Sequence, residues 1–375
     1  MIFMSKINEN YEKLRQLLSP PIGVPLQKGD LTGKLLRNIF TEEEASIVAN
    51  GFKKSLRPVS VRSIKKRVKI PKKKLKAILN DMDYKGNILK IGHFYIVPPY
   101  LPGLFEFYFT HNRDDPERLK AAGEAHYELI RRGFHTEHSQ SAEPLYRVIP
   151  AIDPTEKAVE INQDMDVKHE ILPYEVLEKY LSKKKRFAVQ KCSCRNAAEL
   201  AGEPCKCTKE NYCISAGFLA KRVIESGVGR EVSLEELMEI MRRAEREGLV
   251  HETINIQDTS VFICNCCSCC CGFLKSVKEL DNKKAVVISN FDPIINYDQC
   301  ESCKTCINIC PMSAIDFIED KPIIRLDDCL GCGLCASNCP QKAITLKKVR
   351  NTIPIKSTLK LLRTNKKIRN QHGKV

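Results

Sequence analysis

An internal repeat near the end of the chain of 375 residues constrains its fold more than any other feature of the sequence. Residues 293–315 align with residues 322–344, with eleven identities in 23 positions. The shared positions include four cysteines and the proline after the fourth. They are Cys300, Cys303, Cys306, Cys310 and Pro311 in the first copy and Cys329, Cys332, Cys335, Cys339 and Pro340 in the second. The repeat predicts two similar halves, each a strand, a loop and a short helix, related by a pseudo-twofold axis.

Each copy has the spacing C-x2-C-x2-C-x3-C-P, which is typical of proteins that bind 4Fe-4S clusters. Cysteines three apart can place three thiolates around one cluster, while the fourth lies on the following helix and points elsewhere. Zinc also takes four thiolates, but zinc ribbons pair two C-x2-C groups across a longer gap. The tandem spacing therefore favours iron–sulfur clusters over zinc.

Residues 290–346 resemble the two-cluster ferredoxins of bacterial type, in which the fourth cysteine of each run binds the other cluster. The resemblance implies the ligands Cys300, Cys303, Cys306 and Cys339 for cluster 1 and Cys329, Cys332, Cys335 and Cys310 for cluster 2. The second loop has Gly331 and Gly333 where the first has Ser302 and Lys304, which predicts two inequivalent clusters. Such clusters carry one electron at a time.

The other eleven of the 19 cysteines lie between residues 191 and 285. Neighbouring cysteines point in divergent directions, so the whole group cannot bind one small cluster. We expect one additional Fe–S centre, with the candidate ligands Cys194, Cys205, Cys213 and Cys267. Further candidates are Cys192, Cys207, Cys264, Cys266, Cys269, Cys270 and Cys271. A second centre, a substrate-reducing thiol pair and ordinary buried cysteines are the alternatives.

The wider layout is similar to uncharacterised 4Fe-4S proteins of anaerobic microbes. In these, a winged-helix-like region precedes a C-x-C-R segment, an I-C-N-C-C-x-C-C-C segment and a two-cluster ferredoxin domain. Here the two middle segments are residues 192–195 and 263–271. The resemblance implies an architecture and no established reaction.

The net charge of +15 is concentrated in two segments. Residues 53–90 carry fourteen Lys or Arg and two Asp, and residues 347–375 carry ten Lys or Arg and no acidic residue. Lys72, Lys73, Lys74 and Lys76 begin a helix that could meet DNA phosphates, dock a protein or simply be solvated. The basic tail suits nucleic acid, an acidic protein or a membrane surface equally.

The patterns together predict an α+β multidomain protein. The expected domains are a winged-helix-like domain (1–100), an α/β connecting domain (101–190), a Cys-rich domain (191–285), a two-cluster ferredoxin domain (286–346) and a basic tail (347–375). Capping boxes at Thr41 and Ser233 predict helix starts. Residues 158–161 are expected to form a strand and residues 174–183 a helix.

We expect an iron–sulfur electron-transfer protein that exchanges electrons with a protein partner. No apolar run approaches the length of a membrane helix and no signal peptide is evident, so a cytoplasmic location is expected. No nucleotide-binding loop motif occurs. A redox-responsive DNA-binding regulator and an iron–sulfur reductase with its active site in the Cys-rich domain are the alternative functions. The sequence does not define the oligomeric state.

Overall fold

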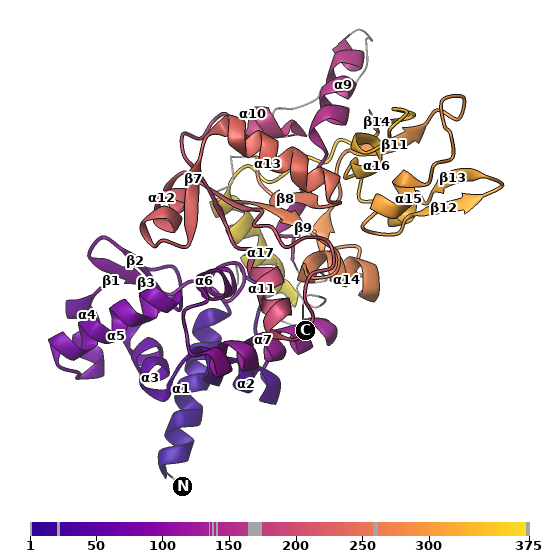
Figure 1. Cartoon of the computed structure of the whole chain (residues 1–375). Helices are drawn as coiled ribbons and strands as arrows, with labels where there is room; N and C mark the ends of the chain where they lie inside the picture. Colours follow the sequence, from indigo (N-terminus) through magenta and orange to yellow (C-terminus); the bar gives the residue numbers. More distant parts are fainter. Residues whose placement is uncertain are drawn as a thin grey trace. The chain divides into compact units, whose positions relative to one another are not determined.

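The computed structural model describes residues 2–20, 23–134, 136, 139, 142–163, 175–257 and 262–372. The chain forms two compact units, which are described separately (Figure 1). Unit 1 consists of residues 1–142, 192–204 and 362–375, and unit 2 consists of residues 143–191 and 205–361. Helices and small sheets occur in both, so the molecule is of the mixed α+β, multidomain type. No helix in the described ranges is long and apolar enough to cross a membrane.

Unit 1 is mainly helical and contains one small sheet. Its elements are α1 (Ile2–Leu18), α2 (Asp30–Ile39), α3 (Glu42–Gly51), β1 (Val59–Ser60), α4 (Val61–Val68), α5 (Lys72–Lys85), β2 (Leu89–Ile91), β3 (Phe94–Ile96), α6 (Leu104–His111), α7 (Pro116–Arg131) and α11 (Ser193–Leu200). Helix α17 (Thr358–His372) begins in unit 2 and ends in unit 1. The strands are ordered β1-β3-β2, and both pairs are antiparallel.

Local sequence signals explain where the helices of this basic region begin. Thr41 caps α3, with both hydrogen bonds of the predicted capping box to Glu44 present. Ser60 caps α4 by accepting a hydrogen bond from the Ser63 amide. In α5, Leu75, Leu79 and Met82 are buried on one face. Residues 42–96 therefore contain three helices followed by the β2–β3 hairpin.

Unit 2 is built on a seven-stranded sheet with the order β10-β4-β8-β9-β6-β5-β7. Its strands are β4 (Tyr146–Ile149), β5 (Phe187–Gln190), β6 (Cys213–Ala216), β7 (Gly229–Val232), β8 (Val250–Ile254), β9 (Phe262–Cys266) and β10 (Val286–Val287). The β10–β4 pair is parallel and the other pairs are antiparallel. Its helices are α9 (Ile152–Gln163), α10 (Leu177–Leu181), α12 (Phe218–Glu225), α13 (Leu234–Arg246) and α14 (Gly272–Leu280).

Two helices of unit 2 test sequence predictions directly. Helix α13 begins after Ser233, whose hydroxyl accepts a hydrogen bond from the Glu236 amide as predicted. The strand predicted at residues 158–161 is wrong, because these residues belong to α9. Pro154 suits the first turn of that helix, and the Thr155 hydroxyl donates to the Ala151 carbonyl. These signals at the start of the helix outweigh the apolar residues at positions 158–161, which had suggested a strand.

The two repeat copies form the last part of unit 2, drawn in orange and yellow in Figure 1. The first copy contributes β11 (Phe291–Ile295), α15 (Thr305–Ile309) and β12 (Ile315–Ile318), and the second contributes β13 (Lys321–Ile324), the 3-10 turn η2 (Leu326–Asp328), α16 (Leu334–Ser337) and β14 (Ile344–Lys348). Strand β11 pairs with β14, and β12 pairs with β13. Each copy has the predicted strand, loop and short helix, and the outer strands of the two copies join.

Candidate functional site

The cysteines of the two repeat copies line two separate pockets. Cys300, Cys303, Cys306 and Cys339 line the first, which we call pocket 1. Cys310, Cys329, Cys332 and Cys335 line the second, which we call pocket 2. Each pocket thus combines three cysteines of one copy with the fourth cysteine of the other. These are the two sets that the ferredoxin resemblance implies.

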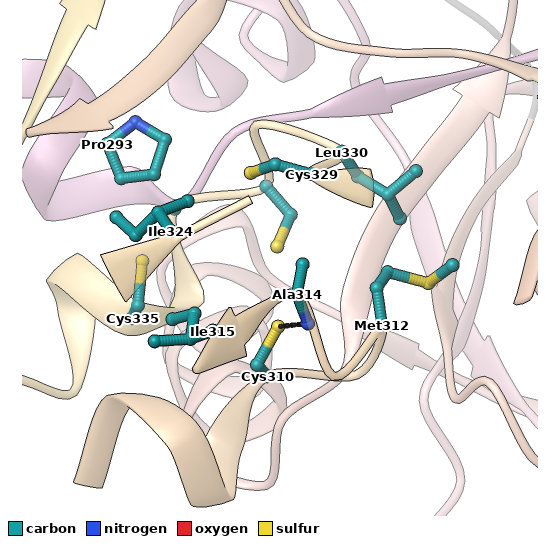
Figure 2. A pocket seen from close by; sticks show the side chains of 11 residues that line it. Pro293, Cys310, Met312, Ala314, Ile315, Ile324, Cys329, Leu330 and Cys335 are labelled. Carbon is teal, nitrogen blue, oxygen red and sulfur yellow. Dashed lines mark hydrogen bonds between the residues drawn. The ribbon is translucent and has the colours of Figure 1, made fainter. Parts of the chain in front are cut away.

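Figure 2 shows how pocket 2 is lined. The sulfur atoms of Cys310, Cys329 and Cys335 lie around one space, and apolar side chains such as Met312 and Ile324 border it. The Ala314 amide donates to Cys310 Sγ at 3.3 Å, and the Gly331 amide donates to Cys329 Sγ at 3.4 Å. Amide donors to sulfur are among the groups that set the potential of a bound cluster.

The two ligand loops share one backbone conformation although their residues differ. Gly331 and Gly333 have φ of +64° and +76°, and Ser302 and Lys304 have φ of +55° and +63°. This left-handed region costs a residue with a side chain about 1–2 kcal/mol. In the first loop, the Ser302 hydroxyl donates a hydrogen bond to the Asp320 carbonyl. That bond offsets part of the cost, and the loop keeps its shape without glycine.

The thiols of the two pockets differ in their electrostatic surroundings. Hydrogen bonding to the Thr305 side chain lowers the pKa of Cys303, which is exposed. Burial raises the pKa of Cys306 in pocket 1 and of Cys329 and Cys335 in pocket 2. A buried thiol with a raised pKa loses its proton when it binds a metal ion, so these thiols suit metal ligation.

The cysteine-rich part of unit 2 contains a tight four-thiol group. It consists of Cys205, Cys207, Cys267 and Cys269, whose sulfur atoms all lie within 4.8 Å of one another. Sγ of Cys205 is 3.6 Å from that of Cys267 and 3.8 Å from that of Cys269, and Cys207 is 3.8 Å from Cys269. The two pairs come from segments separated by about sixty residues, so the fold itself assembles the group.

A second group lies on one face of the central sheet. Glu252 on β8 is opposite Cys264 on β9, and a ligand oxygen of Glu252 lies within 4.8 Å of the sulfur atoms of Cys266 and Cys271. Glu252, Cys266 and Cys271 are all buried, and burial raises the pKa of Glu252 well above its usual value. Oε1 of Glu252 has no hydrogen-bond partner among the described residues. This buried group could bind a metal through one oxygen and two sulfurs.

A hydrogen-bond network on the opposite face holds these strands in register. His251 contacts Asn265 Oδ1 through Nδ1 at 2.6 Å and Glu245 Oε1 through Nε2 at 3.0 Å. The Asn265 side chain also donates to the Tyr212 carbonyl at 2.6 Å. Because side chains alternate along a strand, anchoring Asn265 on this face directs Cys264 and Cys266 to the other.

The residues predicted for the additional centre are only partly together. Cys205 and Cys267 belong to the four-thiol group, whereas Cys213 on β6 is outside it. Cys194 on α11 and Cys192 belong to unit 1. Cys270 lies next to the group, with its Sγ 3.7 Å from that of Cys269. Cys207 and Cys269 were only secondary candidates in the sequence, although their C-x-C spacing from Cys205 and Cys267 is a signal for both.

A family model of the 4Fe-4S dicluster domain matches residues 299–344. The match spans all eight cysteines of the two pockets. It shows an iron–sulfur domain in this part of the chain. No curated protein matches the chain, and no solved structure does. Together with the cysteine-rich region, the match supports binding of a 4Fe-4S cofactor and suggests an iron–sulfur electron-transfer protein.

Proposed function

We propose that the chain is an electron-transfer protein that holds two 4Fe-4S clusters in residues 286–346. Cluster 1 binds Cys300, Cys303, Cys306 and Cys339, and cluster 2 binds Cys310, Cys329, Cys332 and Cys335. The observation that carries the proposal is that each set of four lines its own pocket. When bound, the clusters supply reversible one-electron chemistry. The protein's part is to fix the thiolates, donate amide hydrogen bonds and limit the access of water.

A protein partner at cluster 1 fits the surroundings of pocket 1. Pro322 lines this pocket, and its neighbours on the β12–β13 hairpin, Ile318 and Ile323, are 52% and 41% exposed. Cys303 is itself exposed. Apolar side chains beside a solvent-accessible cluster favour docking of another redox protein, because electrons can then cross a short contact. Cluster 1 is therefore the proposed point of exchange.

The proposal also includes one additional metal centre in the cysteine-rich part of unit 2. The sequence predicts an Fe–S centre there. Within the described residues, the four-thiol group is the strongest support for a metal centre in this region. Cys205 and Cys267, two of the ligands expected from the sequence, belong to that group.

Metal and sulfide analysis of the anaerobically purified chain tests the two-cluster proposal. Two clusters require about eight iron and eight sulfide ions per chain. Reduction should bleach the visible absorption and produce paramagnetic signals from interacting clusters. Cys335→Ser should reduce the signal of cluster 2, and Ser337→Ala on the same helix should leave both clusters intact. Zinc in place of iron, or iron without sulfide, would contradict the proposal.

A second candidate function, redox-responsive binding of DNA, is favoured by the basic region of unit 1. The order α3-β1-α4-α5-β2-β3, in which β3 of the hairpin also pairs with β1, is similar to that of a winged helix and supports this second function. Lys72, Lys73, Lys74 and Lys76 are exposed at the start of α5. Lys74 forms an ion pair with Glu43 at 2.5 Å. Within the described part of the chain the other three lysines have no acidic partner, so they could meet phosphates.

Duplex binding at several salt concentrations tests this second function. If α5 contacts DNA, the combined change of Lys72, Lys73 and Lys76 to Gln should weaken binding and lower the salt dependence by about three phosphate contacts. Matched changes of Lys209, Lys221 and Lys278 in unit 2 should not. Absence of binding at low salt in both the oxidised and the reduced protein would exclude this function.

A further inference from the structure

The four-thiol group has dimensions that differ from those of the two pockets. Within the described chain, ligand atoms of three or more Cys, His, Asp or Glu residues come within 4.8 Å of one another in two places. Both are in the cysteine-rich region, and neither includes a cysteine of pocket 1 or pocket 2. The ferredoxin cysteines therefore supply an internal standard for thiols around a cluster, and the four-thiol group is more compact than that standard.

The spacing of the four sulfur atoms suits a single metal ion. Zinc binds thiolate sulfur at about 2.3 Å in a tetrahedron, so the sulfurs of such a site lie about 3.8 Å apart. The observed separations of Cys205 from Cys267 and Cys269, and of Cys207 from Cys269, are 3.6, 3.8 and 3.8 Å. In a 4Fe-4S cluster each thiolate binds a different iron, which holds the sulfurs further apart. The compact group leaves room for one ion and none for a cluster.

From this geometry we infer that Cys205, Cys207, Cys267 and Cys269 bind one tetrahedral zinc ion, and that the additional centre is redox-inert. This inference rests on the proposed additional centre and changes its kind from Fe–S to a single ion. All four ligand positions are thiolates, as in closed structural zinc sites. Two C-x-C pairs supply them, each bringing two sulfurs from one short stretch of chain.

The site joins two parts of unit 2 that have little regular structure. Residues 205–212 form neither helix nor strand, and Cys205 and Cys207 lie at the start of this stretch. Cys267 and Cys269 lie in the turn between β9 and α14, where the Cys271 amide donates to the Cys267 carbonyl at 3.1 Å. An ion bound by both pairs fastens the loop before β6 to the end of β9. Its role is to hold the end of the central strand β9, which carries Cys264 and Cys266.

The assignment also accounts for the neighbouring cysteines Cys266 and Cys267, because they belong to different groups. Cys266 is in the buried group with Glu252, and Cys267 is in the four-thiol group. Cys270 contacts Cys269 at 3.7 Å and also lies against Cys205 and Cys267, but it is outside the set of four. Comparing Cys270→Ser with Cys207→Ser therefore tests which of these two thiols completes the site.

The test measures zinc, iron and sulfide together in the full chain purified anaerobically. We expect about one zinc per chain in addition to about eight iron and eight sulfide ions. Cys207→Ser should lose the zinc while iron and sulfide are unchanged, because Cys207 is exposed and its loss leaves core packing intact. Cys270→Ser should retain the zinc. Cys207→His should also retain it, because three cysteines and one histidine are an ordinary zinc set.

The outcomes separate this inference from the proposed function. About twelve iron and twelve sulfide ions, with no zinc, would overturn the zinc site in favour of a third cluster. A ninth iron without additional sulfide would overturn zinc as the metal. Eight iron ions without zinc would overturn the zinc site. Zinc that persists in Cys207→Ser and disappears in Cys270→Ser would overturn the ligand assignment. Loss of all iron with zinc retained would instead contradict the ferredoxin proposal alone.

Discussion

Pockets 1 and 2 have the same cysteine spacing but different surroundings. Pocket 1 includes the exposed Cys303 and a loop in which Ser302 and Lys304 adopt left-handed conformations. In pocket 2, burial raises the pKa of every thiol of the second loop, and that loop contains Gly331 and Gly333. The spacing of the cysteines thus determines which sulfur atoms come together. The other side chains of each loop determine the access of water and the local charge. The following predictions test that difference.

The largest effect is expected from Gly331→Ala. A Cβ at this position would lie against the Phe291 carbonyl and the Ser289 hydroxyl, and φ is +64°. The clash and the left-handed conformation together should cost about 3 kcal/mol or more and release the iron of cluster 2. Thermal unfolding and iron analysis measure both effects.

The matched change in pocket 1 is Ser302→Ala, which should cost only about 1 kcal/mol for the lost hydrogen bond and keep all the iron. A second control is Gly92→Ala, where φ is +57° but nothing lies within 4 Å of the added Cβ. Equal destabilisation by Gly331→Ala and Gly92→Ala would show that crowding at the second loop is unimportant.

A chelator should remove iron in two phases. Cys303 is exposed, so cluster 1 should release about four iron ions first, and cluster 2 should follow more slowly. Cys303→Ser should accelerate the first phase without changing the second. Loss of all iron in one phase would mean that the difference in burial does not protect cluster 2.

Lys304 should raise the potential of cluster 1, because a positive charge favours the reduced cluster. Lys304→Gln removes the charge and should lower this potential by on the order of 20–40 mV, less at high salt. The change keeps a side chain at the same φ, so strain is nearly constant. It also removes the cation–π contact of Nζ with the Phe317 ring at 4.2 Å. Lys321→Gln, which removes a similar contact with Tyr297, is the control in a redox titration.

The smallest effect concerns the Thr305 hydroxyl, which is 3.3 Å from Cys303 Sγ. This hydrogen bond lowers the pKa of the Cys303 thiol by stabilising its thiolate. In the iron-free chain, Thr305→Val should therefore raise that pKa, and alkylation of Cys303 should begin at higher pH. Thr345→Val on β14 should not shift the alkylation profile. An unchanged profile for Thr305→Val would contradict the assigned cause.

The sequence predicted the elements that depend on local signals. The capping box at Thr41, the N-cap at Ser233 and the tandem cysteine runs each specify nearby backbone, and each is present. The strand predicted at residues 158–161 was wrong because the helix start at Pro154 lies outside the pattern considered. Local patterns therefore predict element starts better than element types within short apolar stretches.

The candidate site in the cysteine-rich region could be predicted only in part. Eleven cysteines can be combined into many sets of four. Their spacing in the sequence does not predict which distant pairs come together in the fold. The meeting of Cys205 with Cys267 depends on the packing of β6 beside β9, which is a long-range property of the sheet. The two ferredoxin pockets were easier to predict because one known pairing rule covers both.

The pairing of β11 with β14 also affects the order in which the molecule is completed. Within this domain Phe291 is synthesised long before Lys348, and these two residues are partners in the finished sheet. The pairing can form only after the whole stretch has been synthesised. A truncated chain that ends before β14 keeps all eight cysteines of the two copies but lacks the strand that closes their domain. The ferredoxin part of the chain can therefore close only when β14 has been made, whether or not iron is bound.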